Sequence, residues 1–324
     1  MMQKYEFIKY NVNEGDTIES VAKHFDVSTS RLVLVHNLNV EIEDKIQSEF
    51  GNFPKHLTSI YITTEMVRDI EKKSERKTGY VIWATAFYEK RKYGLSLENF
   101  KNEDLISKVH YEMELVYINK KSEFKILEIN RKQLYTNNSQ PDAVLEQLAD
   151  AIGQTIFPIQ INTEGNGKIN SIENHDEIVE RWQAKKEKLS SYYQGEIAEK
   201  IIAKATIYFN NPHAITDSLA NNWFFNLVFQ PIYGSYTTKK QVQNTSSFPI
   251  AGNNLLEFET TQTLGDIYTK TNKIIVDINA KAKDKSDAKA TIQYKLNDTD
   301  NSLFSVIGTM TVNETKTKIE IYQQ

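Results

Sequence analysis

The fold of the first part of this chain is decided by residues 10–38, which read YNVNEGDTIESVAKHFDVSTSRLVLVHNL. Tyr10 and Val12 alternate with polar residues, and this period of two indicates a half-buried strand. The Glu-Gly-Asp sequence that follows ends the strand. Asp16 or Thr17 can then cap a helix, because a side-chain oxygen at this position accepts hydrogen bonds from the first free amides.

Two helices are predicted after this turn. The apolar residues of the first helix share one face at helical spacing: Ile18, Val21, Ala22 and Phe25. Ser28 opens the second helix as its cap, and Leu32 together with residues 35–38 supplies the buried side of that helix. The stretch therefore predicts a strand, a tight turn, a helix, a short turn and a second helix.

This arrangement resembles the LysM module, a small strand-helix-helix-strand domain. The family pattern is close to Tyr-x-Val-x-x-Gly-Asp-Thr-Leu, then an aliphatic-Ala pair, an aromatic residue, Val-Ser, a run of leucines and Asn-Leu. The residues in register with it are Tyr10, Val12, Gly15, Asp16, Thr17, Ile18, Val21, Ala22, Phe25, Val27, Ser28, Leu32, Asn37 and Leu38. The resemblance covers only the first fifth of the chain.

The resemblance implies a binding function. LysM modules bind glycans that contain N-acetylglucosamine, chiefly peptidoglycan and chitin, in a shallow groove between the loop after the first strand and the loop before the second. In some phage-tail-like machines the module serves as a protein dock. The groove positions that the resemblance carries to this chain are Gly15, Asp16, Thr17 and Ile18.

The second half of the module departs from the family pattern. The usual Pro-Gly-Gln turn is absent, and residues 40–57 intervene before the expected strand at 59–62. Within this insertion, Phe53 and Pro54 are expected either to fold over the groove as part of a lid or to make a different contact. We therefore add both residues to the predicted glycan- or partner-binding set.

Composition limits the classes of function. The 324 residues, 40% hydrophobic and 25% charged, suffice for a LysM module and one or two further domains. A net charge of -4 gives no electrostatic reason to expect nucleic acid or anionic lipid as a partner. The chain has no cysteine, which excludes disulfides, thiolate chemistry and Cys-ligated metals.

The first residues carry no signal for secretion. They contain no apolar segment and no small-residue cleavage site, and no window of the chain approaches the roughly 18 apolar residues of a membrane span. We expect a cytoplasmic protein without a membrane span, or one that a dedicated machine exports. A non-glycan partner fits this expectation, because peptidoglycan lies outside the cell.

The whole chain is predicted to be α+β. Residues 1–64 form the LysM module, 65–78 a charged linker or short helix, and 79–324 a large domain of mainly antiparallel sheet that subdivides, if at all, near 206. Strands are expected at 80–88, 110–118 and 124–130, with a turn at 119–122 between the last two, and also at 156–161, 167–172, 255–261, 273–280, 288–296, 303–312 and 316–322. Residues 223–233, in this β-rich part, are strongly aromatic, and the run that begins at Trp223 is expected to be either a buried strand or helix of the sheet core or an exposed partner-binding surface.

Helices are expected at 141–152, capped by Ser139 and ended by Gly153, at 176–203 with a break near Gly195, and at 212–219. The large domain weakly resembles uncharacterised β-rich lipoprotein-like families, and no function is carried across from them. The charge run in the linker is interpreted as a solvated surface.

No catalytic motif is found, so we predict no catalytic residue, no metal site and no cofactor. The six histidines show no metal-ligand spacing, and no serine lies in a Gly-x-Ser-x-Gly elbow. The Asp298-Thr-Asp300 sequence begins like a calcium loop but lacks the glycine and glutamate that such a loop requires. A peptidoglycan hydrolase that LysM targets to the cell wall is the enzymatic alternative.

Two classes of non-catalytic function remain. In one, the module holds a peptidoglycan-type saccharide and the large domain is a scaffold. In the other, the protein is an adaptor whose module docks a protein of a secretion or contractile injection assembly, of the type VI-like kind. Co-sedimentation with peptidoglycan distinguishes the two.

Overall fold

The computed structural model describes residues 7–66, 77–87, 89–118, 126–250, 254–283 and 287–324. Most of the predicted linker and the turn predicted at 119–122 lie outside the described residues. The chain forms two compact units, one of residues 1–78 with 265–275 and one of residues 79–264 with 276–324. The presence of several helices and a large antiparallel sheet confirms the predicted α+β class.

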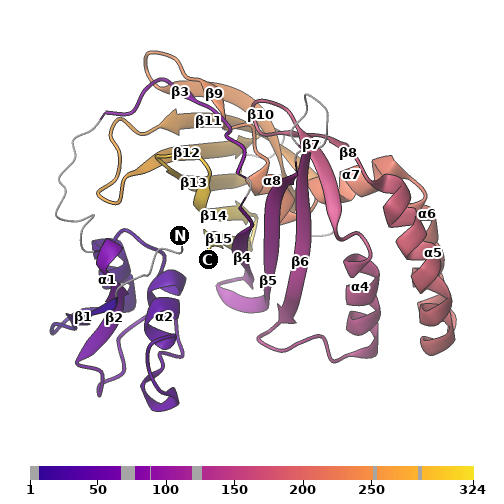
Figure 1. Ribbon diagram of the computed structural model, residues 1–324, viewed down its shortest axis with the longest axis horizontal. Coiled ribbons are helices and arrows are strands. Elements are labelled where there is room, and N and C mark those ends of the chain that lie inside the picture. The colour runs from indigo at the N-terminus through magenta and orange to yellow at the C-terminus, as the bar shows by residue number, and fades with distance from the viewer. Residues whose placement is uncertain (1–6, 67–76, 88, 119–125, 251–253, 284–286) are drawn as a thin grey trace. The chain divides into compact units, whose positions relative to one another are not determined.

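Between residues 7 and 63, the first unit forms its elements in the order strand, helix, helix, strand (Figure 1). Their bounds are β1 Phe7–Asn11, α1 Ile18–His24, α2 Thr29–Asn37 and β2 Ser59–Thr63, with a 3-10 helix η1 Ile42–Asp44 before β2. β1 and β2 pair antiparallel, with Tyr10 opposite Ile60. The buried apolar side chains form a core cluster of Ile18, Val21, Ala22, Phe25, Leu32, Val33, Ile46, Phe53, Ile60, Ile62 and Met66.

Both helices begin at side-chain caps. Thr17, rather than Asp16, is the N-cap of α1: its hydroxyl accepts a hydrogen bond from the Ser20 amide at 3.1 Å, and its own amide donates to the Ser20 hydroxyl at 2.8 Å. This reciprocal capping box satisfies amides that the helix itself leaves unpaired. Ser28 caps α2 by accepting from the Arg31 amide at 3.1 Å, as predicted.

The buried side of α2 differs from the prediction in one residue. Leu32 is fully buried, whereas Leu38 is 72% exposed, so its predicted place on the buried side is wrong. The two residues are six positions apart, which turns Leu38 by about 240° around the helix axis from Leu32. His36, which belongs to the same predicted set, is buried, and its ring bonds to backbone on both sides.

His36 connects three elements of the first unit. Its Nδ1 accepts a hydrogen bond from the Tyr61 amide at 3.2 Å, which places the proton of the neutral ring on Nε2. Nε2 then donates to the Asp44 carbonyl at 3.0 Å. The ring thereby joins α2 to β2 and to η1, which is a structural role.

The segment between α2 and β2, where the sequence departs from the LysM pattern, is anchored to the unit at defined points. Ile46 and Phe53 are buried in the core cluster. The Asn37 side chain donates to the Ile46 carbonyl at 2.9 Å and accepts from the Ile46 amide at 2.8 Å. These contacts hold the insertion against α2.

The second unit is built on an 11-stranded sheet with the strand order β10-β11-β12-β13-β14-β15-β4-β5-β6-β7-β8 (Figure 1). The bounds are β4 Arg91–Lys101, β5 Asp104–Ile118, β6 Ile126–Thr136, β7 Ile159–Thr163, β8 Ile169–Ile172, β10 Gln241–Ile250, β11 Asn254–Leu264, β12 Lys273–Ala282, β13 Lys289–Asn297, β14 Leu303–Val312 and β15 Thr315–Gln323. Two short strands, β3 Val81–Ile82 and β9 Gly234–Ser235, pair separately.

The two halves of this sheet meet where β15 pairs antiparallel with β4. Ile321 lies opposite Leu95, and both side chains are fully buried. Gly94 lies opposite Tyr322, and a side chain at position 94 would collide with the Tyr322 ring. The glycine therefore allows the last strand to lie beside β4.

Helices connect the strands in two places. α4 (Val144–Gln154) lies between β6 and β7, and four helices lie between β8 and β9: α5 His175–Tyr192, α6 Glu196–Phe209, α7 Pro212–Ala220 and α8 Trp223–Val228. α7 contacts β8, and α8 contacts β10, so consecutive helices reach both edge strands of the sheet. The Asn226 amide donates to the Ser247 carbonyl of β10 at 2.9 Å.

Several local predictions are corrected by tertiary context. The aromatic run at 223–233, for which a buried strand and a buried helix were both expected, begins as the helix α8, because Asn222 caps it by accepting from the Phe224 and Phe225 amides. The run predicted as a strand at 80–88 pairs only over Val81–Ile82, and Tyr88 lies outside the described residues. Ser139 forms a bridge with Thr136 instead of capping a helix, and Gly153 lies inside α4.

Buried tyrosines connect the sheet to the segments that cover it. The Tyr294 hydroxyl of β13 donates to the Leu227 carbonyl of α8 at 3.0 Å, and the Tyr111 hydroxyl of β5 donates to the Asn222 side chain at 3.1 Å. Burial raises the pKa of Tyr111 and of Tyr294 above its usual value, so both remain neutral donors. Each hydroxyl supplies the hydrogen bond that a buried tyrosine requires.

Replacing Tyr294→Phe should lower the free energy of unfolding of the second unit by about 1 kcal/mol, because one buried hydrogen bond is lost while the ring remains. Tryptophan fluorescence during urea unfolding reports the unfolding midpoint of the second unit, since Trp83, Trp182 and Trp223 all belong to it. The control Tyr192→Phe, at a side chain that is 76% exposed, should leave the midpoint unchanged. Equal effects of the two substitutions would contradict the assigned role of the Tyr294 hydroxyl.

Candidate functional site

The structure brings the two predicted groove loops of the first unit together. Residues 13–18 and 50–54, named here the loop pair, meet in an antiparallel bridge between Thr17 and Asn52. The Ile18 amide donates to the Gly51 carbonyl at 2.9 Å, and the Gly51 amide donates to the Glu19 carboxylate at 3.0 Å. Residues more than thirty positions apart in the sequence thus form one surface.

Asp16 organises the first loop of the pair. Its Oδ2 accepts hydrogen bonds from the Asn13 amide at 2.8 Å and from the Tyr10 hydroxyl at 3.0 Å. The hydrogen bond from the Asn13 backbone, followed by that from Tyr10, holds the pKa of Asp16 below its usual value. Gly15 precedes it with φ of +88°, a left-handed conformation that a side chain would strain.

The predicted binding residues differ in how much they face solvent. Gly15 is exposed, Asp16, Thr17 and Pro54 are partly buried, and Ile18 and Phe53 are in the core. The structure therefore places the six residues together, but the Ile18 and Phe53 side chains contribute to packing. Their role in binding stays a prediction.

The backbone amides of Asp16, Thr17 and Ile18, in the first loop, are already used within the chain. The Asp16 amide donates to the Asn13 carbonyl at 3.1 Å, the Thr17 amide to the Ser20 hydroxyl, and the Ile18 amide to the Gly51 carbonyl. These three amides are therefore not available to a ligand on this surface.

An apolar segment beside α2 was missed by the sequence reasoning. Leu34, Leu38 and Ile42, named here the apolar segment, are 38%, 72% and 76% exposed. Leu34 and Leu38 lie one helical turn apart, since the Leu38 amide donates to the Leu34 carbonyl at 3.0 Å. The helical period counted from Leu32 would have indicated that Leu38 faces solvent.

The second unit holds a cluster of partly buried ionisable groups beside a cavity of about 50 Å³. The Arg91 guanidinium bonds to Asp300 and Ser302 and lies 4.2 Å from the centre of the Phe87 ring. Burial opposes ionisation of Asp300, but hydrogen bonds from Ser302 and Arg91 hold the pKa of its carboxyl below the usual value. The cluster ties the start of β4 to the turn after β13, and arginine cannot exchange a proton.

The described part of the chain offers no metal centre. Among these residues, no group of three or more His, Asp or Glu side chains could hold a metal ion. His175 bonds to the Phe209 carbonyl at 2.9 Å, so a second histidine, like His36, contacts backbone. Of the helices described, none is long and apolar enough to cross a membrane.

Asp16→Asn should weaken the loop pair and speed amide hydrogen exchange in α1 at neutral pH, because the variant lacks the carboxylate that Asn13 and Tyr10 stabilise. The folded pKa of Asp16 is depressed, so its contribution is complete above the unfolded value of about 3.9 and is lost as the pH falls through the folded value. The difference from wild type should therefore shrink below about pH 4.

Glu14→Gln changes a neighbouring carboxylate of the same loop and serves as the control. It should leave exchange in α1 unchanged at both pH values. A difference between Asp16→Asn and wild type that persists in full at low pH would contradict the role assigned to the Asp16 carboxylate.

The comparisons with known proteins do not identify a family. No protein-family model and no curated protein matches the chain. A solved structure described as lipid-protein interactions in lipovitellin is similar to it, with a TM-score of 0.42 and 9% identity over 72% of this chain. The match spans only 25% of that lipovitellin chain. At this degree of similarity nothing about ligand or activity follows for the present protein.

Proposed function

We propose that this chain is a non-catalytic binding or adaptor protein in which the first unit is a LysM-type docking module. The observation that carries the proposal is the loop pair: a strand-helix-helix-strand unit joins the loop after β1 to the loop before β2 through Thr17 and Asn52. These are the two loops between which the resembling family binds its ligands. The second unit then has the role of a scaffold.

A protein partner is the ligand that the surface of the first unit supports best. The amides of Asp16, Thr17 and Ile18 are engaged within the chain, which removes donors that a saccharide would use. The apolar segment instead exposes three aliphatic side chains. Burying such side chains yields about 25 cal/mol per Å² and is typical of the centre of a protein interface. A secretion or contractile injection assembly is the setting that the family resemblance implies.

Leu38→Lys combined with Ile42→Lys should abolish this docking. Affinity capture of the tagged full-length protein from its native cell should recover a partner with wild type, and the double variant should recover at least about tenfold less, because interface side chains at a hot spot contribute more than 1 kcal/mol each. Leu105→Lys with Ile106→Lys is the matched control, since these exposed aliphatic side chains belong to the second unit.

A partner that both double variants retain, or that both lose equally, would contradict docking through the apolar segment. Far-UV circular dichroism of each variant should match wild type. The four substituted side chains are 53% to 76% exposed, so their replacement should not disturb either core.

A saccharide is the second candidate ligand, favoured by the exposed Gly15 and Asn52 at the junction of the loops. Full-length protein should then co-sediment with isolated peptidoglycan sacculi, and Asn52→Phe, which places a ring over the junction, should prevent it. Asn11→Phe, an exposed position in β1, is the matched control and should still pellet. If wild type stays in solution, the saccharide candidate is excluded and the adaptor function is unaffected.

A further inference from the structure

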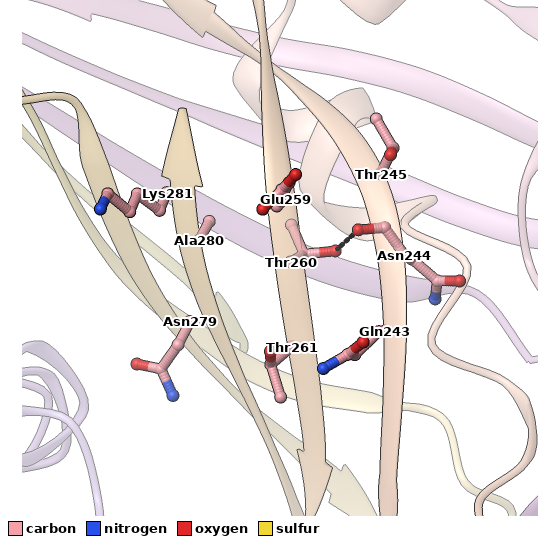
Figure 2. A pocket seen from close by; sticks show the side chains of 9 residues that line it. All are labelled: Gln243, Asn244, Thr245, Glu259, Thr260, Thr261, Asn279, Ala280 and Lys281. Atoms are coloured by element: carbon pink, nitrogen blue, oxygen red, sulfur yellow. Dashed lines mark hydrogen bonds between the residues drawn. The ribbon is translucent and has the colours of Figure 1, made fainter. Parts of the chain in front are cut away.

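A hollow of about 700 Å³ lies on the sheet of the second unit, over strands β10, β11 and β12 (Figure 2). Its volume falls within the range of about 300 to 1,000 Å³ that is typical of ligand sites. β10 is an edge strand of the sheet, and the lining residues on all three strands include exposed side chains. The hollow is therefore open to solvent and accessible to a ligand from outside.

The register of the three strands shows how the hollow is built. Two cross-strand rows on one face of the sheet form its walls: Thr245, Glu259 and Lys281 in one row, and Gln243, Thr261 and Asn279 in the other. Side chains alternate between the two faces, so these rows are about 7 Å apart along the strands.

The row between the walls supplies the floor. Asn244, Thr260 and Ala280 lie opposite one another, and the Thr260 and Ala280 side chains are buried, which leaves their backbone between the walls. The Thr260 hydroxyl donates to the Asn244 carbonyl at 3.0 Å (Figure 2). Because every lining residue lies on a paired strand, the site is fixed before a ligand arrives.

The charged side chains of the two flanking rows are paired. Beyond one wall, Lys283 pairs with Glu257 at 3.4 Å. Beyond the other, the Gln293 amide donates to Asp277 at 2.9 Å. By contrast, none of the six wall side chains has a hydrogen-bond or ion-pair partner within the described ranges of the chain. The donors and acceptors of the walls are therefore available to a ligand in the hollow.

The chemistry of the walls selects the class of ligand. Two carboxamides and two hydroxyls each offer both a donor and an acceptor, and the single carboxylate of Glu259 is balanced by the single ammonium of Lys281. No aromatic or large apolar side chain lines the hollow. A ligand that fits must be neutral, polar and rich in groups that donate and accept together, which describes the hydroxyls of a saccharide.

We propose that the hollow on β10, β11 and β12 is a binding site for a neutral oligosaccharide. The carboxamides of Gln243 and Asn279 hold ligand hydroxyls from the two outer strands, and Thr261 contacts the ligand between them. The site belongs to the second unit, and it does not depend on the function proposed for the first unit.

Isothermal titration calorimetry of the full-length protein with maltotetraose, cellotetraose and chitotetraose tests the proposal. At least one of these neutral probes should bind with a Kd of about 1 mM or tighter. Gln243→Ala with Asn279→Ala should weaken that binding at least about tenfold, since both carboxamides that bind ligand hydroxyls are removed. Gln241→Ala is the matched control, because Gln241 is an exposed residue of β10 outside the hollow, and it should bind like wild type.

Three results would overturn the proposal: binding of none of the neutral probes, binding that the double variant leaves unchanged, or tighter binding of a sulfated heparin tetrasaccharide than of any neutral probe. Asn52→Phe, in the first unit, separates this site from the loop pair. Binding that Asn52→Phe abolishes and the double variant retains would place the saccharide on the first unit and count against the hollow.

Discussion

The pairing of β15 with β4 is the constraint on which the second unit depends. It joins a strand near residue 95 to one near residue 320, and the strands β4 to β8 and β10 to β15 become a single sheet only through it. Bringing such distant segments together costs loop-closure entropy, which burial along the seam must offset. Leu95 and Ile321 supply that burial, and Gly94 leaves room for the Tyr322 ring.

Once β15 and β4 have joined the two halves of the sheet, helices pack against both of its edge strands. α7 contacts β8 and α8 contacts β10, and the Tyr294 and Tyr111 hydroxyls fix the α8 region to the strands. Hydroxyls with raised pKa values keep their protons at any physiological pH, so these connections do not respond to acidity. In the aromatic run that begins at Trp223, the Phe224 and Phe225 side chains are therefore buried in the core of the second unit.

Polar side chains of the loop pair bond within the chain, whereas, in its described part, the wall side chains of the hollow do not. In the loop pair, the side chains of Asp16 and Thr17 form hydrogen bonds within the chain, and so do the amides of Asn13, Asp16, Thr17 and Ile18. On the sheet, charged side chains are paired at several positions, as Lys108 is with Glu98 at 3.1 Å and Lys132 with Glu114 at 3.0 Å. The six wall side chains of the hollow on β10, β11 and β12 have no such partner among the described residues. Because these side chains lie on paired strands, they offer a ligand fixed donors and acceptors.

The spacing of residue types in the sequence predicted two kinds of element. These are helices whose capping hydrogen bonds join residues a few positions apart, and strands that pair with the next strand along the chain. The Thr17 and Ser28 caps, the apolar face of α1 and the successive strands β11 to β15 all follow from residue types and their spacing. β4 and β10 were missed because their polar residues, such as Asn244 and Ser246, lack the β-branched or aromatic pattern of a strand. Pairing with β15 and β5 stabilises β4, and pairing with β11 stabilises the edge strand β10, where the intrinsic strand propensity of their residues is low.

In the candidate sites, too, some features follow from local sequence and others from tertiary structure. Sequence alone determined that Gly15, Asp16 and Thr17 form a turn that starts a helix, because the groups involved lie within four residues of one another. Only tertiary structure decided that Asn52 meets Thr17, that Ile18 and Phe53 face the core, and that Gln243, Thr261 and Asn279 share a row. Which side chains stand next to one another across strands is set by register and long-range packing, and these are properties of the folded chain as a whole.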